Sequence, residues 1–327
     1  MSNVLIIGAG SIALRHIAAL SKIPEVKIVG VCDIVREKAE SLAAQTNAEA
    51  LTNFKTAIDK LKPDYVILLT PRGFREPVIN ACVESMTPIF MEKPPCDRIS
   101  TGERIAEILE TSGLIHTVGF MRRWNDALNT VLAQISSQMI STIEISYQCP
   151  FATSPVWQSY PAPYLVEQSG GLVGDQGIHY IDICRYITGA EPYELYAAGT
   201  NQILPISKNV TTRDTVSWCM IMTNGTVVSH SHTWCAPGWA CNIRIVTDRS
   251  IVSLDMFGGT ATGMINDENF NYQSQTDEFE LEHRAFAEAV KTQDMSNVRS
   301  PYKDALKSFR IAAEINRLLY GHTTELD

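Results

Sequence analysis

The sequence lacks the features of a membrane protein or a nucleic-acid-binding protein. No apolar run approaches the roughly 18 residues that a membrane-spanning helix needs. Basic residues are also in deficit, since 27 Lys and Arg stand against 36 Asp and Glu and give a formal net charge of −9. Phosphate-binding surfaces need an excess of basic side chains. We therefore expect neither nucleic acid nor a membrane as a partner, and expect a small-molecule substrate.

Paired cysteine motifs are missing as well. The eight cysteines are scattered without a C-x-x-C pair, which is typical of reduced thiols in a cytoplasmic protein. No basic segment precedes the apolar run Val4–Ile7, so no secretory signal is predicted. The chain of 327 residues, 45% hydrophobic, can form two domains with full cores. We expect a cytoplasmic two-domain protein.

Short apolar runs alternate with helical patterns in the first third of the chain. This alternation predicts a doubly wound parallel sheet, an α/β Rossmann domain over residues 1–121, followed by a second domain over 122–327. The predicted strands are Val4–Gly8, Lys27–Cys32, Asp64–Leu69, Pro88–Met91 and Leu114–Val118. The predicted helices after the first one are Arg36–Thr46, Glu76–Ser85 and Thr101–Thr111.

A glycine-rich turn follows the first predicted strand and opens a helical pattern. Its residues Gly8-Ala-Gly-Ser-Ile-Ala13 have the spacing G-x-G-x-x-A, which is typical of dinucleotide sites in this strand–turn–helix setting. Gly8 allows the tight turn, and Gly10 lets the backbone approach a pyrophosphate. The start of the helix, at Ser11 and Ile12, then faces the phosphates.

An acidic residue ends the second predicted strand. Asp33 lies 20 residues after Ala13, where a ribose-binding carboxylate is expected. Its charge would repel a 2′-phosphate, which favours NAD over NADP. Arg36 is close in sequence and could accept that phosphate, so NADP stays open as the cofactor.

Two further strand ends carry candidate residues. Ligands of parallel sheets bind at the carboxyl ends of the strands, where Thr70-Pro71 and Glu92-Lys93-Pro94 are expected. A lysine before proline is restricted in its backbone conformation. Its ammonium could hydrogen-bond a substrate hydroxyl and a cofactor ribose, and would stabilise a developing alkoxide. The alternative is a solvated surface lysine.

The segment Gly170–Asp182 contains a carboxylate and an imidazole four residues apart. In a helix this spacing places Asp175 and His179 on one face. The acid would orient the ring, which titrates near neutral pH and can transfer a proton. The glycines before the pair would let another backbone or a ligand come close. The alternative is a buried helix start with a structural Asp–His hydrogen bond.

The remaining sequence predicts a sheet-rich second domain. The loop before Gly170 carries Trp157, Tyr160 and Tyr164, whose flat faces suit a sugar ring unless they are core residues. His230 and His232 share one strand face, but their spacing matches no common zinc site. The expected strands are Thr142–Gln148, Glu194–Thr200, Thr215–Met222, Thr226–Trp234, Cys241–Thr247 and Ile251–Leu254, with a hairpin turn at Asn224-Gly225. The expected helices are Trp124–Gln138, Asp277–Lys291 and Tyr302–Tyr320, and the last helix could pack back on the first domain.

These motifs together resemble the glucose–fructose oxidoreductase, inositol dehydrogenase and MocA-like (Gfo/Idh/MocA) family over most of the chain. The resemblance implies that Lys93, Asp175 and His179 form the catalytic triad. His179 would be the acid/base on the reacting oxygen, and Lys93 would bind substrate and cofactor. The motifs that carry it are Gly8–Ala13, Asp33, Thr70-Pro71, Glu92–Pro94, Gly119–Arg123 and Gly170–Asp182.

The cofactor loop departs from the family pattern. After Thr70-Pro71 the family usually carries Asn and then His, whereas this sequence has Arg72 and Arg75. Both are expected to contact the cofactor, and with Arg122 they could favour a carboxylate-bearing substrate. By resemblance, Met121 and Arg122 also belong to the substrate site.

The resemblance also implies an open-faced, mostly antiparallel sheet in an α+β second domain. One face would cover the substrate, and the other would form a homodimer or homotetramer, so the sheet should be buried on both sides. The expected reaction is hydride transfer between NAD(P) and a secondary alcohol or ketone of a sugar or cyclitol. Two alternatives remain. One is a non-catalytic dinucleotide-binding sensor. The other is a different reaction on this scaffold, either imine or pyrrole-type reduction or redox-assisted elimination.

Overall fold

The computed structural model describes residues 1–154 and 165–321, and the chain divides into two compact units. The first unit consists of Met1–Met121 and Thr276–Lys307, and the second of Arg122–Gln275 and the chain from Ser308. The sequence predicted a single domain boundary after residue 121, which assigned residues 276–307 to the second domain. They group with the first unit because helix α10 (Glu278–Thr292) packs on α1 (Ser11–Leu20).

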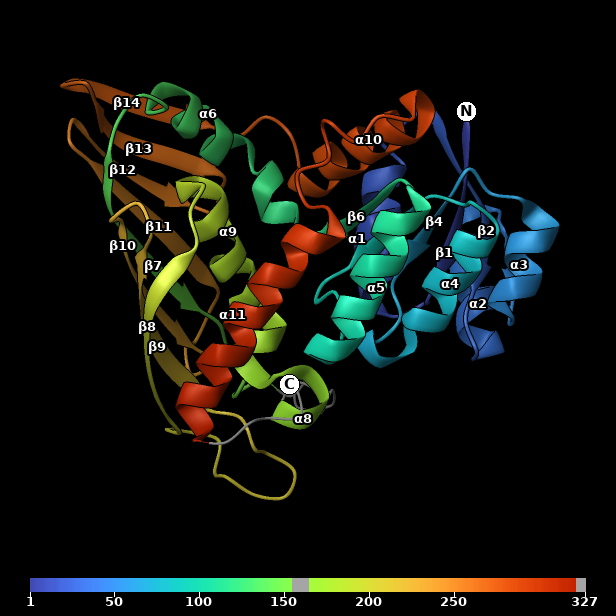
Figure 1. Ribbon diagram of the computed structural model, residues 1–327, viewed down its shortest axis with the longest axis horizontal. Helices are drawn as coiled ribbons and strands as arrows, with labels where there is room; N and C mark the ends of the chain where they lie inside the picture. The colour runs from blue at the N-terminus through green and yellow to red at the C-terminus, as the bar shows by residue number, and fades with distance from the viewer. Residues whose placement is uncertain (155–164, 322–327) are drawn as a thin grey trace. The chain divides into compact units, whose positions relative to one another are not determined.

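The first unit is built on a six-stranded parallel sheet of order β3-β2-β1-β4-β5-β6 (Figure 1). This order confirms the predicted doubly wound sheet. Its strands are β1 (Ser2–Ile7), β2 (Val26–Cys32), β3 (Glu49–Leu51), β4 (Tyr65–Leu68), β5 (Ile89–Glu92) and β6 (His116–Gly119). Its other helices are α2 (Arg36–Thr46), α3 (Phe54–Leu61), the 3₁₀ turn η1 (Arg72–Phe74), α4 (Glu76–Glu84), α5 (Ile99–Ser112) and the start of α11 (Tyr302–Tyr320).

The core of this unit explains why the central strands are continuous apolar runs. Val4 and Ile6 of β1 are fully buried, together with Ile67 of β4 and Phe90 of β5. Helices cover both sides of the parallel sheet, so neither face of these strands can be polar. Phe286 of α10 joins the same core, which anchors this late segment of the chain to the first unit.

The second unit contains an eight-stranded sheet of order β14-β13-β12-β11-β7-β10-β9-β8. Among the strands that the structure describes in this sheet, only β7 and β10 pair in parallel, so the predicted mostly antiparallel sheet is confirmed. Its strands are β7 (Ile140–Gln148), β8 (Pro192–Thr200), β9 (Thr215–Met222), β10 (Val227–Thr233), β11 (Ala240–Thr247), β12 (Ser250–Asp255), β13 (Thr260–Ile265) and β14 (Glu268–Gln273).

One helix of the second unit is shorter than the sequence predicted. The single helix expected over 124–138 is divided into the 3₁₀ turn η2 (Met121–Trp124) and α6 (Asp126–Gln134), because the Asn125 side chain caps the start of α6. The other helices are α8 (Val166–Ser169), the π-helical turn η4 (Val173–Gly177) and α9 (Ile178–Thr188). No helix of residues 1–154 or 165–321 is both long and apolar enough to span a membrane.

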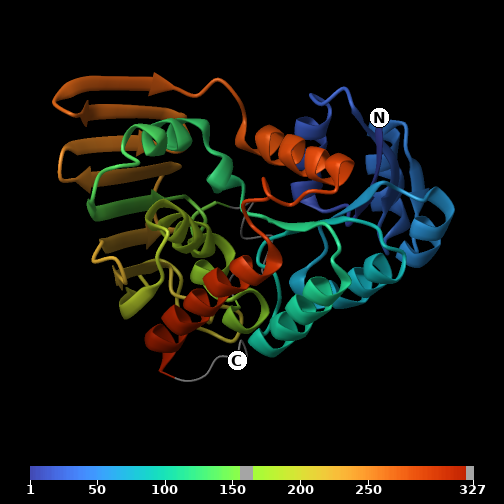
Figure 2. The ribbon, with the colours of Figure 1, turned by 45° about the horizontal axis from the view of Figure 1, so that its top comes forward.

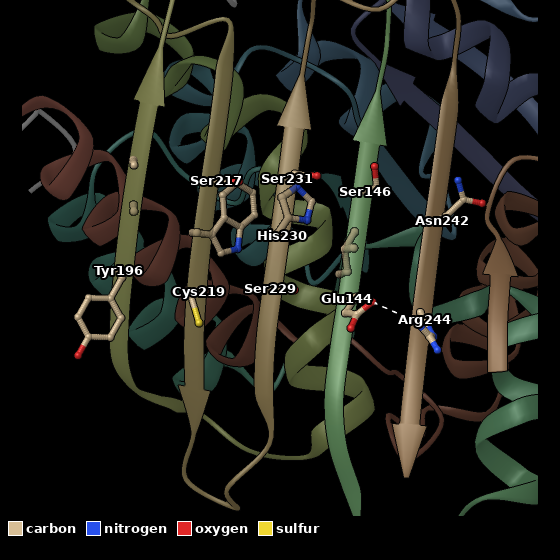
Figure 3. A pocket seen from close by; sticks show the side chains of 14 residues that line it. Glu144, Ser146, Tyr196, Ser217, Cys219, Ser229, His230, Ser231, Asn242 and Arg244 are labelled. Carbon is tan, nitrogen blue, oxygen red and sulfur yellow. Dashed lines mark ion pairs between the residues drawn. The ribbon is translucent and has the colours of Figure 1, made fainter. Parts of the chain in front are cut away.

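The two faces of the eight-stranded sheet differ in burial. Helices α6 and α9 lie along one face (Figure 2), and strand residues that point there, such as Val228 and Ile243, are fully buried. The opposite face carries mainly small polar and charged side chains (Figure 3), and Ser229 and Ser231 are exposed there. The expected burial of the sheet on both sides is therefore not found among the described residues of this chain, because its strands alternate between apolar and polar residues.

A buried ion pair between Asp182 of α9 and Arg123 of η2 lies within the second unit. The Asp182 carboxylate accepts hydrogen bonds from Arg123 Nε at 2.7 Å and Arg123 Nη2 at 2.6 Å. Ser308 of α11 donates a third at 2.8 Å, and Arg185 Nη1 lies 3.9 Å away. Asp182 and both arginines are buried, so the pair links η2, α9 and α11 without solvent screening.

We predict that Asp182→Asn destabilises the fold by about 3–5 kcal/mol, because it leaves the buried Arg123 guanidinium against a neutral partner, whereas Arg185 keeps its ion pair with Glu191 at 2.7 Å. Urea unfolding measures the change. The control is Glu288→Gln, which removes an exposed partner of Lys291 at 3.5 Å and should alter stability by less than about 0.5 kcal/mol. Equal changes in the two variants would contradict the prediction.

Candidate active site

The glycine-rich turn packs tightly against the end of β4. Gly8 has φ +107°, and a Cβ atom there would lie 2.8 Å from the carbonyl carbon of Leu69 and 2.9 Å from the Thr70 nitrogen. Only glycine fits this conformation and this approach. The turn therefore brings Gly8 and Thr70, two predicted cofactor residues, into contact.

The start of α1 has the properties of an anion site. Gly10 is the N-cap and provides no side-chain cap, and the first turn contains no acidic residue. Apart from Gly10 itself and the chain next to it, no atom of residues 1–154 or 165–321 lies within 4 Å of the position where a Gly10 Cβ would be. Thr70 Oγ1 is buried and has no hydrogen-bond partner among the described residues. Free backbone donors and open space fit the pyrophosphate of a dinucleotide.

Asp33 connects the end of β2 to the glycine-rich turn. Its carboxylate accepts hydrogen bonds from the Ala9 amide at 2.7 Å and the Val35 amide at 2.9 Å. The carboxylate keeps further lone pairs for a ribose hydroxyl. Arg36, the residue that kept NADP open, is exposed and pairs with Glu40 at 3.6 Å. The arrangement fits NAD better than its 2′-phosphorylated form.

The Lys93 turn follows β5 and contains buried polar side chains. Glu92 Oε2 accepts a hydrogen bond from the Lys93 amide at 3.0 Å, and Glu92 Oε1 lies 3.0 Å from His16 Nε2. Burial alone would raise the pKa of Glu92, but the hydrogen bond and charge of His16, with the charges of Lys93 and Arg75, lower it overall. Glu92 is thus an ionised carboxylate that accepts the hydrogen bond of the Lys93 amide.

The two arginines of the predicted cofactor loop are both buried. Arg72 begins η1, directly after Pro71. The Arg75 guanidinium donates to the carbonyl groups of Thr70 at 3.0 Å, Glu92, Lys93 at 3.3 Å and Pro94. Arg75 therefore binds the protein's own backbone, and sequence reasoning had no signal for this.

The segment with Asp175 and His179 is helical, but its geometry differs from a regular α-helix. Residues Val173–Gly177 form the π-helical turn η4, which runs directly into α9. Asp175 lies within that turn and His179 in the first turn of α9, where it is buried. A π turn contains an extra residue and is frequent at functional sites. The structure therefore places both residues on one continuous helical segment.

Glycines in this segment are required by neighbours from the same unit. A Cβ on Gly174 would lie 2.5 Å from the Ser169 carbonyl oxygen, and one on Gly171 would lie 2.4 Å from Thr212 Oγ1. Larger residues would push the π turn away from these contacts. The predicted close approach is thus found, and its partners include protein backbone.

Gln176 anchors the π turn to the sheet. Its side-chain oxygen accepts hydrogen bonds from Trp234 Nε1 at 2.9 Å and His232 Nε2 at 3.1 Å, and Cys149 Sγ lies at 3.7 Å.

His230 stacks on Trp218 with ring centroids 3.8 Å apart. Burial lowers the pKa of His230 to about 3, so it is neutral and structural.

Two of the predicted substrate residues lie in the turn η2. Met121 and Arg122 lie in η2; Arg122 is buried, donates to the Met256 carbonyl at 3.2 Å and lies over the Phe257 ring. Trp157 and Tyr160 lie outside the described residues, as does Tyr164. Within residues 1–154 and 165–321, no group of His, Cys, Asp and Glu side chains is arranged to hold a metal ion.

The predicted residues thus form two clusters, one in each unit. In the first unit, the ends of β1, β2, β4 and β5 bring together the residues predicted to bind the cofactor, with Lys93 among them. In the second unit, η4 and α9 hold Asp175 and His179. His16, His283 and Gln176 were not predicted from the sequence. His283 lies far from every motif, and His16 and Gln176 lie next to or within motifs but belong to no recognisable pattern.

Comparison with known proteins identifies the family of both parts of the chain. Residues 2–120 match the family described as "Oxidoreductase family, NAD-binding Rossmann fold" (GFO_IDH_MocA). Residues 139–253 match the "GFO/IDH/MocA C-terminal domain". Together the two matches include the glycine-rich turn, Lys93 and the segment with Asp175 and His179.

Individual relatives extend the comparison. "Uncharacterized oxidoreductase YrbE" of Bacillus subtilis is 25% identical over 98% of this chain and 96% of its own length. The scyllo-inositol 2-dehydrogenase (NAD(+)) of the same organism is 29% identical over 57% of this chain and 54% of its length. The structure of scyllo-inositol dehydrogenase from Lactobacillus casei, with bound NAD(H) and scyllo-inositol, superposes with a TM-score of 0.83 at 20% identity. That superposition covers 98% of this chain and 97% of the other, and shows a shared fold.

We predict that Gly10→Ala weakens NADH binding roughly tenfold or more, because the added methyl group occupies the space for the pyrophosphate. Folding should be nearly unchanged, since Gly10 has an ordinary φ of −77° and no protein atom close by. Fluorescence titration of NADH and urea unfolding measure the two quantities. The control is Gly238→Ala, which also has open space around its Cβ position and should change neither. Unaltered NADH affinity in Gly10→Ala would place the pyrophosphate elsewhere.

Proposed function

Because the chain belongs to the GFO/IDH/MocA family of NAD-binding oxidoreductases, we propose that it transfers a hydride between nicotinamide and a secondary alcohol or ketone of a cyclitol or sugar. The observation that supports this most directly is that one chain contains both a cluster suited to a dinucleotide, with Lys93 in it, and a helical segment that carries Asp175 and His179. The substrate class follows the relatives named as inositol dehydrogenases.

The first unit, with residues 1–121 at its centre, is proposed to be the cofactor domain. Gly8, Gly10, Ser11 and Ile12 would hold the pyrophosphate, and Asp33 the adenosine ribose. Thr70 and Pro71 line the same edge of the sheet. Bound NAD would supply the hydride acceptor, and the protein would hold the substrate in line with it and exclude water.

Two side chains are proposed to act on the reacting oxygen. His179 would accept the hydroxyl proton as the alcohol is oxidised and return it in the reverse direction. Lys93 would donate a hydrogen bond to the same oxygen and stabilise the charge that develops on it. Asp175, on the same helical segment, would orient the imidazole.

We predict that the wild-type protein reduces NAD⁺ with at least one compound from a panel of cyclitols, neutral sugars and sugar acids. His179→Ala should then lower kcat by about 10²–10⁴-fold, the usual contribution of a general acid/base, while NADH affinity stays within about threefold. The reaction is followed by the absorbance of reduced nicotinamide.

The matched control is His116→Asn, which removes a buried imidazole bonded to the Leu114 carbonyl in the first unit. This variant should keep the wild-type kcat. Near-normal turnover of His179→Ala at every pH would exclude His179 as the acid/base. NADH binding without turnover of any compound would contradict the proposed substrate class.

The exposed face of the eight-stranded sheet is proposed as the surface that forms a homodimer or homotetramer. It presents short polar side chains together with the exposed ring of Tyr196, and Glu144 and Arg244 pair at 3.8 Å across it (Figure 3). A flat sheet face of this kind can meet a second copy of itself through a two-fold axis.

Light scattering should therefore give a mass of two or four chains. Ser229→Arg places a long charged side chain at the centre of this face and should shift the protein toward the monomer, because like charges would meet across the two-fold axis. Ser136→Arg, at an exposed position between α6 and β7, should not. A monomeric wild-type protein would overturn the proposed assembly.

A further inference from the structure

The backbone of the Lys93 turn is held by buried side chains at successive peptide groups. Arg75 donates to the carbonyl groups of Glu92, Lys93 and Pro94, and Tyr302 donates to that of Pro95 at 3.1 Å. Arg75 and Tyr302 are both buried. Turns usually satisfy such carbonyl groups with water or local backbone, so this turn is unusually well fixed.

The amide side of Lys93 is held as firmly. Its N–H donates to Glu92 Oε2 at 3.0 Å. The other oxygen of Glu92 faces His16 Nε2, and His16 Nδ1 lies 2.8 Å from His283 Nε2. Both histidines have no exposed surface. This chain of contacts from α10 through α1 to β5 restricts the Glu92 carboxylate to one orientation.

The protonation of this cluster is consistent with its contacts. Burial and the charge of His16 lower the pKa of His283 well below its ordinary value, so His283 is neutral. Burial lowers the pKa of Arg75 to about 10, which leaves its guanidinium charged and all five N–H groups available. An ionised Glu92 can only accept, so His16 Nε2 must donate to it.

We propose that Arg75 and Glu92 are positioning residues that fix the direction of the Lys93 side chain. The peptide groups before and after the Lys93 Cα are both hydrogen-bonded to buried groups, and the Cα–Cβ direction follows from those two planes. The proposal rests on the role proposed above for Lys93. It also explains Arg75 without a cofactor contact, since its donors are taken up by backbone carbonyl groups of the same unit.

The arrangement also connects the cofactor edge with the lysine. Arg75 Nε donates to the Thr70 carbonyl at 3.0 Å, and Thr70 packs against Gly8. One guanidinium thus sets the spacing between Thr70, two residues after β4, and the turn after β5. A lysine at position 75 would offer a point charge that cannot reach several carbonyl groups in one plane.

The first test is hydrogen exchange of the cofactor-free protein, measured by mass spectrometry on peptides that cover residues 90–96. Pro94 and Pro95 carry no amide hydrogen, so the Lys93 amide contributes a large share of the exchange outside β5. Arg75→Lys and Glu92→Gln should each speed this exchange at least tenfold. Arg104→Met, which removes an exposed partner of Glu76, should leave it unchanged.

The second test is steady-state kinetics with whichever compound the wild-type protein oxidises. Arg75→Lys should lower kcat by about 10–100-fold, since a small displacement of a reacting group is costly. KM and the NADH dissociation constant should stay within about threefold. A purely structural role would lower the amount of folded protein and leave kcat per folded molecule unchanged.

The outcomes separate this proposal from the proposed function. Unchanged exchange of the 90–96 peptides in both cofactor-free variants would overturn the positioning role, whatever the activity. If Arg75 mainly contacted the cofactor, exchange would change only in the NADH complex, and NADH affinity would fall. If the wild-type protein turned over no compound while exchange rose as expected, the proposed function would fail and the structural part of this inference would remain. Should Arg75→Lys not fold, Glu92→Gln alone decides the exchange test.

Discussion

One guanidinium, that of Arg75, satisfies the Thr70 carbonyl and three consecutive carbonyl groups that begin at the last residue of β5. Each of these groups would be costly to bury alone. Because the donors of Arg75 lie in one plane, the turn that carries Lys93 and the end of β4 must keep a fixed separation. The glycine-rich turn then fits against β4, where Gly8 approaches the Leu69–Thr70 peptide. The carboxyl-terminal edge of the sheet is therefore one connected structure.

In the second unit, a neutral amide group likewise connects separate elements through several hydrogen bonds. The side-chain oxygen of Gln176 accepts hydrogen bonds from Trp234 and His232, which belong to the sheet or follow it directly. This anchors the π turn that contains Asp175 and precedes His179. The ion pair of Asp182 with Arg123 holds the middle of the same helical segment, in α9. In both units, the residues proposed to act on substrate lie beside buried polar groups that are fully engaged with the protein.

The predictability of each element followed from the length and strength of its local pattern. Long periodic or fully buried segments were predicted closely, among them α2, β9 and α11. Strand β3 was not predicted, because it has three residues and none is buried. Helix α3 and strands β13 and β14 were also not predicted. The family motifs identified the segments of the candidate site. The His16–His283 contact joins residues 267 apart, and no local pattern contains that information.

The structure also changes the argument about the charge of the substrate. From sequence, Arg72, Arg75 and Arg122 together could favour a carboxylate-bearing substrate. Arg75 instead donates to backbone carbonyl groups, and Arg122 donates to the Met256 carbonyl and lies over Phe257. A guanidinium that is already bound to carbonyl oxygens has fewer donors for a bidentate carboxylate contact. Arg75 and Arg122 therefore give less support to a carboxylate-bearing substrate than their positions in the sequence suggested. The neutral ring alcohol proposed above needs only one donor and one proton acceptor at its oxygen, the roles proposed for Lys93 and His179.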